Sequence, residues 1–187
     1  MTDQHQTTPS RDTVKKRVHI VQMDAATLAA LADSDLEAAN RTSPVPLTPY
    51  FVGSDWRSVW RYRSRQVVAD PSSQAWITGV IWDAEQGVAV GRAGYHGPPD
   101  ESGTVEVGYA VEPAFRRQGY ARAALEALLD RAAGEPEVRV VRASISPDNI
   151  ASFKLVSQYG FAEVGEQWDD EDGLEIIYEV DASRRPS

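Results

Sequence analysis

Two arginines and a glycine, Arg116, Arg117 and Gly119, stand between a predicted strand and a predicted helix. The first turn of a helix has amide N–H groups without internal partners, and the helix dipole adds about half a positive charge there. Gly119 lets a ligand approach the backbone closely, and the arginines add full charges in a chain whose formal net charge is −9. This combination is typical of a site for a di- or polyphosphate. Alternatively, the glycine only makes a turn and the arginines are solvated.

The residues on both sides of this turn have regular hydrophobic periodicities. Apolar residues occupy the odd positions of 105–111, which predicts a strand. After the turn, apolar residues recur at helical spacing from Ala121 to Ala132, and Gly134 followed by Pro136 predicts the end of the helix. The order strand, basic glycine turn, helix therefore places the predicted phosphate site at the start of a helix.

Arg116-x-x-Gly119-x-Ala121 in this setting resembles the acetyl-CoA signature of the GNAT superfamily of N-acetyltransferases. Asn149-x-x-Ser152 with Gly160-Phe161 resembles the second motif of that superfamily, in the expected order and at the usual separation. The resemblance covers about residues 17–181 and is strongest to the Rim-type branch, the ribosomal-protein N-terminal acetyltransferases. It implies acetyl-CoA as the acyl donor, bound by Ala110, Val111, Arg116, Arg117, Gln118, Gly119, Tyr120, Ala121, Asn149 and Ser152.

Acetyl transfer from a thioester to an amine needs donors for the carbonyl oxygen and a base for the amine proton. The resemblance implies that main-chain amides at Ala110 or Val111, where the strand leaves its neighbour, serve as the carbonyl donors. Some GNAT enzymes place their base on this strand, which makes Glu106 the candidate. Glu106 could equally be a solvated carboxylate or could bind the ammonium group of the acceptor.

The departing thiolate also needs a proton, and the sequence offers only a weak candidate for the general acid that would supply it. Many GNAT enzymes have a tyrosine seven residues after the motif asparagine, but this chain has Val156 there. Ser152 is the nearest hydroxyl and has a short reach, and Tyr159 lies one turn further on. Asn149 could hold the pantetheine arm, cap the helix that follows it, or do both.

Aromatic residues concentrate in the segment that, by the resemblance, covers the acceptor. The candidates for the acceptor pocket are Tyr50, Phe51, Trp56 and Trp60, together with Leu47. Alternatively, these side chains pack the predicted helices onto the sheet, which is the more frequent role of aromatic residues at helical spacing.

Composition limits the function classes. The chain has 187 residues with 42% hydrophobic and 25% charged residues, as expected of one globular domain, and its lack of cysteine excludes disulfides and a cysteine nucleophile. The negative charge disfavours nucleic-acid binding, and no apolar run approaches the roughly 20 residues that span a bilayer. His5, His19 and His96 lack ligand spacing, so we expect no metal. We expect a cytoplasmic monomer or homodimer.

The pattern of elements predicts the order β-αα-βββ-α-β-α-ββ. This is a mixed α/β (α+β) fold with a twisted mixed sheet of six to seven strands and about four helices, as the GNAT resemblance also implies. We expect a disordered tail over 1–16, a single domain over 17–181 and a tail over 182–187. The predicted strands are 17–23, 74–83, 88–95, 105–111, 137–146, 161–168 and 174–180, with turns at 85–87 and 172–173, and the predicted helices are 25–39, 54–68, 121–134 and 149–159.

These features predict an N-acetyltransferase in which a primary amine attacks bound acetyl-CoA directly. A protein or peptide N-terminus is the first candidate acceptor because of the Rim-type spelling, and a small-molecule amine is the second. The alternative from another class is a non-catalytic acyl-CoA-binding sensor or interaction module, which Val156 keeps open.

Overall fold

The computed structural model describes residues 16–170 and 173–183. The predicted N-terminal tail, apart from Lys16, lies outside these residues, as do Asp172 of the predicted turn and the chain after Ser183. The α-helices and strands are, in chain order, β1 (His19–Val21), α1 (Ala25–Ala32), α2 (Leu36–Thr42), α3 (Arg57–Ala69), β2 (Gly79–Asp83), β3 (Val88–Tyr95), β4 (Thr104–Val111), α4 (Tyr120–Gly134), β5 (Val140–Ile145), α5 (Ile150–Val156), β6 (Ala162–Asp169) and β7 (Gly173–Asp181). Short 3₁₀ helices occupy Pro49–Val52, Ser54–Trp56, Pro71–Ala75, Pro113–Phe115 and Ser157–Tyr159.

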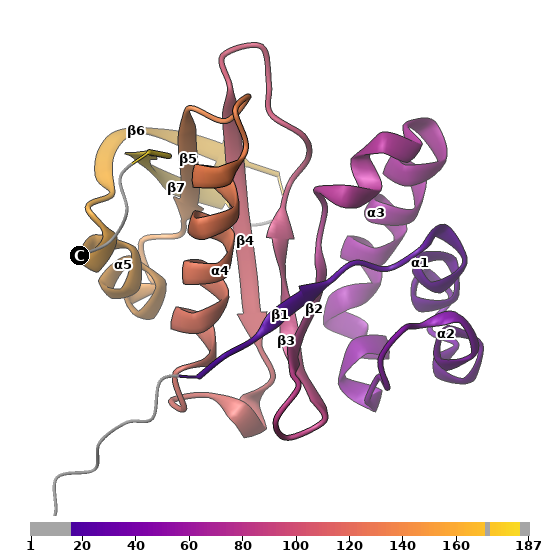
Figure 1. The fold of residues 1–187 in the computed structure, drawn as a ribbon. Coiled ribbons are helices and arrows are strands. Elements are labelled where there is room, and N and C mark those ends of the chain that lie inside the picture. Colours follow the sequence, from indigo (N-terminus) through magenta and orange to yellow (C-terminus); the bar gives the residue numbers. More distant parts are fainter. Residues whose placement is uncertain (1–15, 171–172, 184–187) are drawn as a thin grey trace, which may run out of the picture.

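The strands form one mixed sheet in the order β1-β2-β3-β4-β5-β7-β6. Only β4 and β5 run parallel, and every other neighbouring pair is antiparallel. Helix α4 provides the crossover between the two parallel strands, as a parallel pair requires. In Figure 1, α4 packs on the sheet with its axis roughly along β4, next to α5, and α1, α2 and α3 form a separate group next to β2. The predicted mixed α/β architecture is confirmed. The sheet has seven strands, where six to seven were predicted, and the described residues form five α-helices, where about four were predicted.

Two hydrophobic cores hold the helices to the sheet. One core lies under α4 and includes Leu125, Leu128 and the β4 residue Val105. The other lies under α1 and α3 and includes Leu28 and Trp60. Neighbouring residues of β2 are divided between the cores, Ile81 with α4 and Val80 with α1 and α3, because successive side chains of a strand point to opposite faces.

The single helix predicted over residues 25–39 is wrong, because the chain forms two helices there. Ser34 has φ +60, which ends α1, and the Asp35 side chain accepts a hydrogen bond from Ala38 N at 2.8 Å to start α2. The sequence Asp33-Ser34-Asp35 contains the polar residues that favour such a cap, and helical spacing of the leucines obscured it.

The strand predicted over residues 74–83 is also shorter than expected. Pro71–Ala75 forms a 3₁₀ helix that the Asp70 side chain caps through Ser72 N at 3.0 Å, and β2 begins only at Gly79. The apolar alternation around Trp76 reflects burial on both sides of a loop, which periodicity alone does not distinguish from a strand.

Candidate functional site

The turn before α4 has the backbone conformation expected of an anion site. Gly119 is the N-cap of α4 with φ +91, and Arg117 also has a positive φ of +61. Within the part of the chain that the structure describes, no side chain caps this helix end, and the first turn of α4 has no acidic residue. The first N–H groups of α4 therefore keep their hydrogen-bonding capacity for a ligand.

Tyr120 takes part in this site through its backbone, since its side chain belongs to the core. The ring is 1% exposed, and its hydroxyl donates to Asp83 Oδ2 at 2.7 Å. Lys16 Nζ lies 3.7 Å from the same carboxylate oxygen. Burial by itself raises the pKa of Asp83, but the hydrogen bond from Tyr120 and those from backbone N–H groups hold the pKa below its ordinary value. This contact fixes the start of α4 to the end of β2.

A cleft of about 610 Å³ opens beside the turn, and we call it the larger cleft. Of the described residues that line it, none is Asp or Glu, although the chain is acidic overall. Its basic residues are the predicted Arg116 and Arg117 and two that the motifs did not indicate, Arg122 and Lys154. Four cations without an acid match a polyanionic ligand. The other lining residues are Tyr109, Ala110, Val111, Phe115, Gly119, Tyr120, Ala121, Asn149, Ala151, Ser152, Leu155 and Gln158.

The structure thus brings together every predicted donor-binding residue except Gln118. The exposed Gln118 side chain donates to Ala114 O at 3.1 Å and is not among the lining residues. Arg116 lines the cleft and also donates from Nε to Val111 O at 3.1 Å, which ties the turn to the end of β4. Its remaining guanidinium N–H groups extend the positive charge of the turn.

Strands β4 and β5 part along half of their length. They pair only between residues 104–106 and 140–142, whereas β4 continues to Val111 and β5 to Ile145. The parallel strands therefore leave a gap next to the larger cleft, with unpaired backbone groups along the β4 edge. Such an edge can pair with an extended ligand arm.

The register of β4 against β3 decides which amides face this gap. His96 N–H donates to Glu106 O at 2.8 Å, and Glu112 N–H donates to Val90 O at 2.9 Å, so the even-numbered residues of β4 direct their backbone toward β3. Ala110 has the same parity, and the prediction that its amide serves as a carbonyl donor is therefore wrong, although Ala110 lines the cleft. The Val107 N–H takes part in the last bridge to β5, opposite Arg142, so the N–H groups that face the gap are those of Tyr109 and Val111.

A second cleft of about 310 Å³ lies along the same gap, and we call it the smaller cleft. Tyr109, Asn149 and Ser152 line both clefts, so the two meet at these three side chains. The remaining lining residues of the smaller cleft are Arg92, His96, Val107, Gly108, Ala143, Ser144, Ile145, Ser146 and Glu175.

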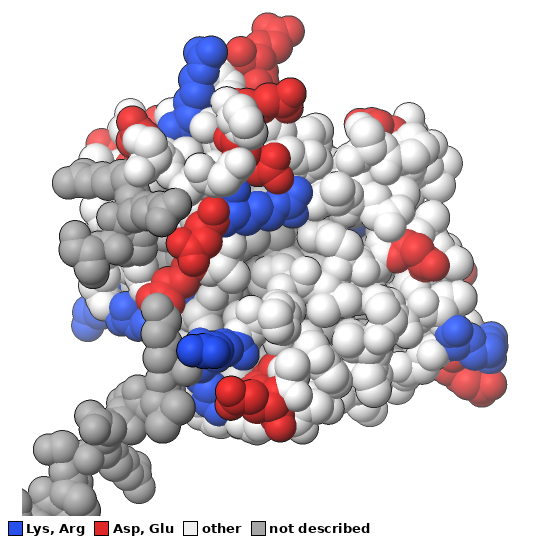
Figure 2. Space-filling view, in the orientation of Figure 1, with Lys and Arg blue, Asp and Glu red and all other residues white. Residues whose placement is uncertain are grey.

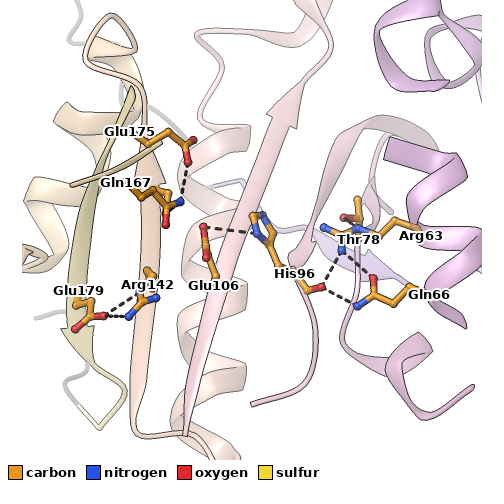
Figure 3. A network of polar contacts seen from close by, with 10 residues as sticks. Arg63, Gln66, Thr78, His96, Glu106, Arg142, Gln167, Glu175 and Glu179 are labelled. Atoms are coloured by element: carbon orange, nitrogen blue, oxygen red, sulfur yellow. Dashed lines mark hydrogen bonds and ion pairs between the residues drawn. The ribbon is translucent and has the colours of Figure 1, made fainter. Parts of the chain in front are cut away.

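His96, which follows β3, lines the smaller cleft, whereas Glu106 lines neither cleft. His96 Nδ1 lies 3.6 Å from Glu106 Oε1 (Figure 3), and its Nε2 lies 3.1 Å from where a Cβ at Gly108 would be. The His96 side chain is 52% exposed, and its partial desolvation lowers its pKa. The Glu106 carboxylate raises the pKa in part, and Arg63 and Arg92 lower it further. The net lowering keeps the imidazole neutral at pH 7, so it can accept a proton.

The backbone at His96 is held from helix α3. Arg63 Nη1 donates to His96 O at 2.8 Å, and Gln66 Nε2 donates to the same oxygen at 2.9 Å (Figure 3). Arg63 is only 6% exposed, and its Nε donates to Thr78 Oγ1 at 3.2 Å. These bonds fix the position of the imidazole relative to β4. A lone histidine in a loop has no local sequence signal for such a role, and reasoning from metal-ligand spacing passed over it.

Helix α5 carries the residues of the second motif. Asn149 Oδ1 accepts from Ser152 N at 3.1 Å, so the asparagine caps the helix while its side chain also lines both clefts. Val156 is fully buried in the core under α4. Tyr159 lines neither cleft, because its hydroxyl is bonded to Glu126 Oε1 at 2.7 Å and to Arg122 Nη1 at 3.0 Å.

The predicted acceptor aromatics divide into two groups. Phe51 and Trp60 are at most 1% exposed, and Trp60 Nε1 donates to Phe51 O at 2.7 Å, so both are core residues and their assignment to the acceptor pocket is corrected. Leu47 is buried as well. Tyr50 and Trp56 are half-buried with ring centroids 5.4 Å apart.

Trp56 is connected to the smaller cleft through Arg92. The Arg92 guanidinium carbon lies 4.1 Å from the centroid of the Trp56 ring, a cation–π contact, and Arg92 lines the smaller cleft. Tyr50 and Trp56 therefore lie one side chain away from that cleft.

The surface and the remaining side chains show two further features. Acidic and basic side chains are interspersed on the face drawn in Figure 2, and the wide area over α1–α3 is mostly uncharged. Within residues 16–170 and 173–183, no three His, Asp or Glu side chains gather as a metal site would require, and no helix has the length and apolar character needed to cross a bilayer.

The chain is similar in sequence to known acetyltransferases. A family model described as an acetyltransferase (GNAT) domain matches residues 17–162. The chain is 29% identical over 108 residues to the uncharacterized N-acetyltransferase YjdG of Bacillus subtilis (strain 168), which covers 58% of this chain and 64% of that protein. It is 31% identical over 115 residues to L-2,4-diaminobutyric acid acetyltransferase of Streptomyces anulatus, covering 56% and 65%. The matches thus span just under two thirds of each relative.

Solved structures share the fold. RimJ of Mycobacterium smegmatis, in complex with a CoA disulfide, superposes with a TM-score of 0.60 at 19% identity over 94% of this chain and 91% of that chain. A mutant of spermidine N-acetyltransferase SpeG from Vibrio cholerae gives a TM-score of 0.63 at 13% identity, covering 90% and 96%. Together with the match over residues 17–162, which includes the basic glycine turn and the Asn149 cap, this confirms the resemblance: the chain belongs to the GNAT acetyltransferase family.

Proposed function

We propose that this protein transfers an acetyl group from acetyl-CoA to a primary amine, by direct attack of the amine in a ternary complex. The observation that carries the proposal is the meeting of two clefts at Tyr109, Asn149 and Ser152, where β4 and β5 part. A thioester held from one side and an amine entering from the other would meet there without a covalent enzyme intermediate.

The larger cleft suits CoA in three respects. The uncapped start of α4 offers N–H groups to the diphosphate. Arg116, Arg117, Arg122 and Lys154 supply positive charge for the phosphates. The β4 edge in the gap offers backbone groups to the amide-bearing pantetheine arm. Acetyl-CoA is the acyl-donor substrate in this assignment, and no metal is required.

The thioester carbonyl would be polarised by the amides that face the gap, Tyr109 and Val111. Backbone N–H groups are fixed by the sheet before the reaction, so they need no reorganisation as negative charge develops on the carbonyl oxygen. The proposed carbonyl donors are thus Tyr109 and Val111, whereas the sequence predicted Ala110 or Val111.

We assign the amine proton to His96, with Glu106 as its carboxylate partner. The neutral imidazole lines the smaller cleft, and a carboxylate 3.6 Å from Nδ1 stabilises the imidazolium that forms when Nε2 takes the proton. Glu106 would thus assist deprotonation without contacting the amine. An α-amine has a pKa of about 7.7–8.0 against about 10.4 for lysine, so it would be the less demanding acceptor.

The acceptor is a primary amine that fits the smaller cleft near Arg92 and Glu175, with Tyr50 and Trp56 beside it. Three of the similar proteins are named after their acceptors, which are a ribosomal protein, spermidine and diaminobutyric acid. We therefore propose a peptide N-terminus or a small-molecule amine as the acceptor class.

The test measures CoA release with a thiol reagent across a panel of N-terminal peptides, polyamines and diamino acids, followed by mass spectrometry of the product. Turnover that requires both acetyl-CoA and one of the amines is the expected result. Tight acetyl-CoA binding without turnover on any amine would instead identify the non-catalytic sensor that Val156 kept open.

A further inference from the structure

One hydroxyl at the junction of the two clefts has no assigned partner. The Oη atom of Tyr109 is buried and has no hydrogen-bond partner within the described residues. Buried polar groups are nearly always bonded, and an orphaned one at a site calls for a reason. By contrast, the buried Tyr95 on the neighbouring strand β3 donates its hydroxyl to Leu128 O at 2.6 Å.

Tyr109 could also supply the proton donor that the second motif lacks. Val156, at the position of the tyrosine in many GNAT enzymes, is buried in the core and has no proton to give. Tyr109 lines both clefts together with Ser152, and the two hydroxyls are close enough to influence each other. A phenol on β4 can therefore approach the junction from the sheet instead of from α5.

We propose that Tyr109 is the general acid that protonates the departing thiolate of CoA. This inference rests on the proposed acetyl transfer. The amine nitrogen bonds to the thioester carbonyl carbon, and the carbon–sulfur bond breaks with its electron pair going to sulfur. Sulfur takes the Tyr109 proton, the amine proton passes to His96, and the phenolate regains a proton from water. The products are the amide and CoA thiol.

The chemistry of Tyr109 suits this step. Burial raises the pKa of its hydroxyl, and the interaction with Ser152 lowers it only in part, so the phenol stays protonated at neutral pH. Ser152 has the shorter side chain and a more weakly acidic hydroxyl. The Ser152 hydroxyl lies near the phenol without satisfying it, so we move the expected role of the acid from Ser152 to Tyr109.

The experiment compares Tyr109→Phe with Tyr95→Phe in the intact chain. Tyr109→Phe keeps the ring and removes the orphaned hydroxyl. We expect kcat to fall about 100-fold, at the lower end of the range for general acids because a thiolate is a good leaving group. The affinity for acetyl-CoA should change less than about twofold, and the thermal midpoint should be unchanged or higher, because an unsatisfied buried group has been removed.

Tyr95→Phe removes a bonded hydroxyl outside both clefts and should give the opposite result, a lower thermal midpoint with kcat within about twofold of wild type. A loss of activity with no loss of stability is the signature of a catalytic hydroxyl, which a merely structural one does not produce.

Three results would overturn the proposal. If wild type is active and Tyr109→Phe retains kcat within twofold, Tyr109 is not the acid. If Ser152→Ala loses activity 100-fold while Tyr109→Phe does not, Ser152 is the acid. A wild-type protein that releases no CoA with any amine would refute the acetyl-transfer function itself, and with it the role of Tyr109. Equal losses in both single variants and in the double variant would support a Tyr109–Ser152 pair acting as one unit.

Discussion

Substitution of Gly119 separates backbone strain from charge at the start of α4. Gly119 has φ +91, and a Cβ built there has Lys16 Cγ as its nearest neighbour at 3.7 Å, an ordinary contact. Gly119→Ala therefore introduces strain without a clash. A residue with a Cβ in the left-handed region costs about 1–2 kcal/mol, which for a domain of this size lowers the thermal midpoint by about 2–8 °C.

Gly119→Glu adds a negative charge to the same strain. For a carboxylate about 6 Å from a diphosphate with roughly two charges, repulsion is between about 1.4 kcal/mol in water-like surroundings and about 5.5 kcal/mol at an effective dielectric constant near 20. This corresponds to a loss of about 10-fold to 10⁴-fold in CoA affinity relative to Gly119→Ala. The two variants should have similar thermal midpoints.

The assay is titration calorimetry of both variants with CoA and, separately, with acetylpantetheine, which lacks the diphosphate. Charge repulsion predicts a large difference between the variants for CoA and none for acetylpantetheine. Equal CoA affinities for Gly119→Ala and Gly119→Glu would refute the placement of the diphosphate at this turn.

Three further changes test other parts of the structure. Tyr120→Phe should lower the free energy of unfolding by about 1–3 kcal/mol, because the buried Asp83 carboxylate loses its 2.7 Å hydrogen bond. The pKa of Asp83 is lower in the folded than in the unfolded protein, so the Asp83 carboxylate stabilises the fold above about pH 4, and this stabilisation is lost as the pH falls through the folded pKa. Denaturant curves should therefore show the difference in unfolding free energy between wild type and Tyr120→Phe becoming smaller in acid. His96→Gln should lower kcat/KM about 100-fold. In the wild type, kcat/KM should rise with pH through an apparent pKa below the usual histidine value of about 6.5, and this rise should be absent from the variant. A variant that keeps the rise would exclude His96 as the base. Gly94→Ala places a Cβ 2.5 Å from Ile77 O, so the neighbouring backbone must shift, and we expect a loss of about 1–3 kcal/mol in thermal or denaturant unfolding; a variant as stable as wild type would contradict the packing of this strand.

Local patterns were sufficient for most of the elements. The alternation over 105–111 and the helical spacing after Gly119 predicted β4 and α4 closely, because each follows a single periodicity between clear turn residues. The errors occurred where two signals competed. The leucines of α1 continued a helical pattern past Ser34, and apolar alternation around Trp76 imitated a strand in a loop buried from both sides.

The basic glycine turn and the Asn149 cap depend on neighbours within a few residues, so both features could be predicted from local sequence. The membership of the cleft did not follow from local sequence. Arg122 and Lys154 reach the larger cleft only because α4 and α5 lie side by side on the sheet, and nothing near them in the chain distinguishes them from solvated cations (Figure 1).

Which groups face the gap between β4 and β5 depends on long-range pairing and packing. The register of β4 against β3 directs the Ala110 amide away from the gap and the Tyr109 amide into it. The parting of β4 from β5 places His96 and Tyr109 on one cleft, and the packing of α3 buries Trp60 in the core. Each of these outcomes depends on strand pairing or packing between residues far apart in the chain, and a local sequence pattern carries no information about either.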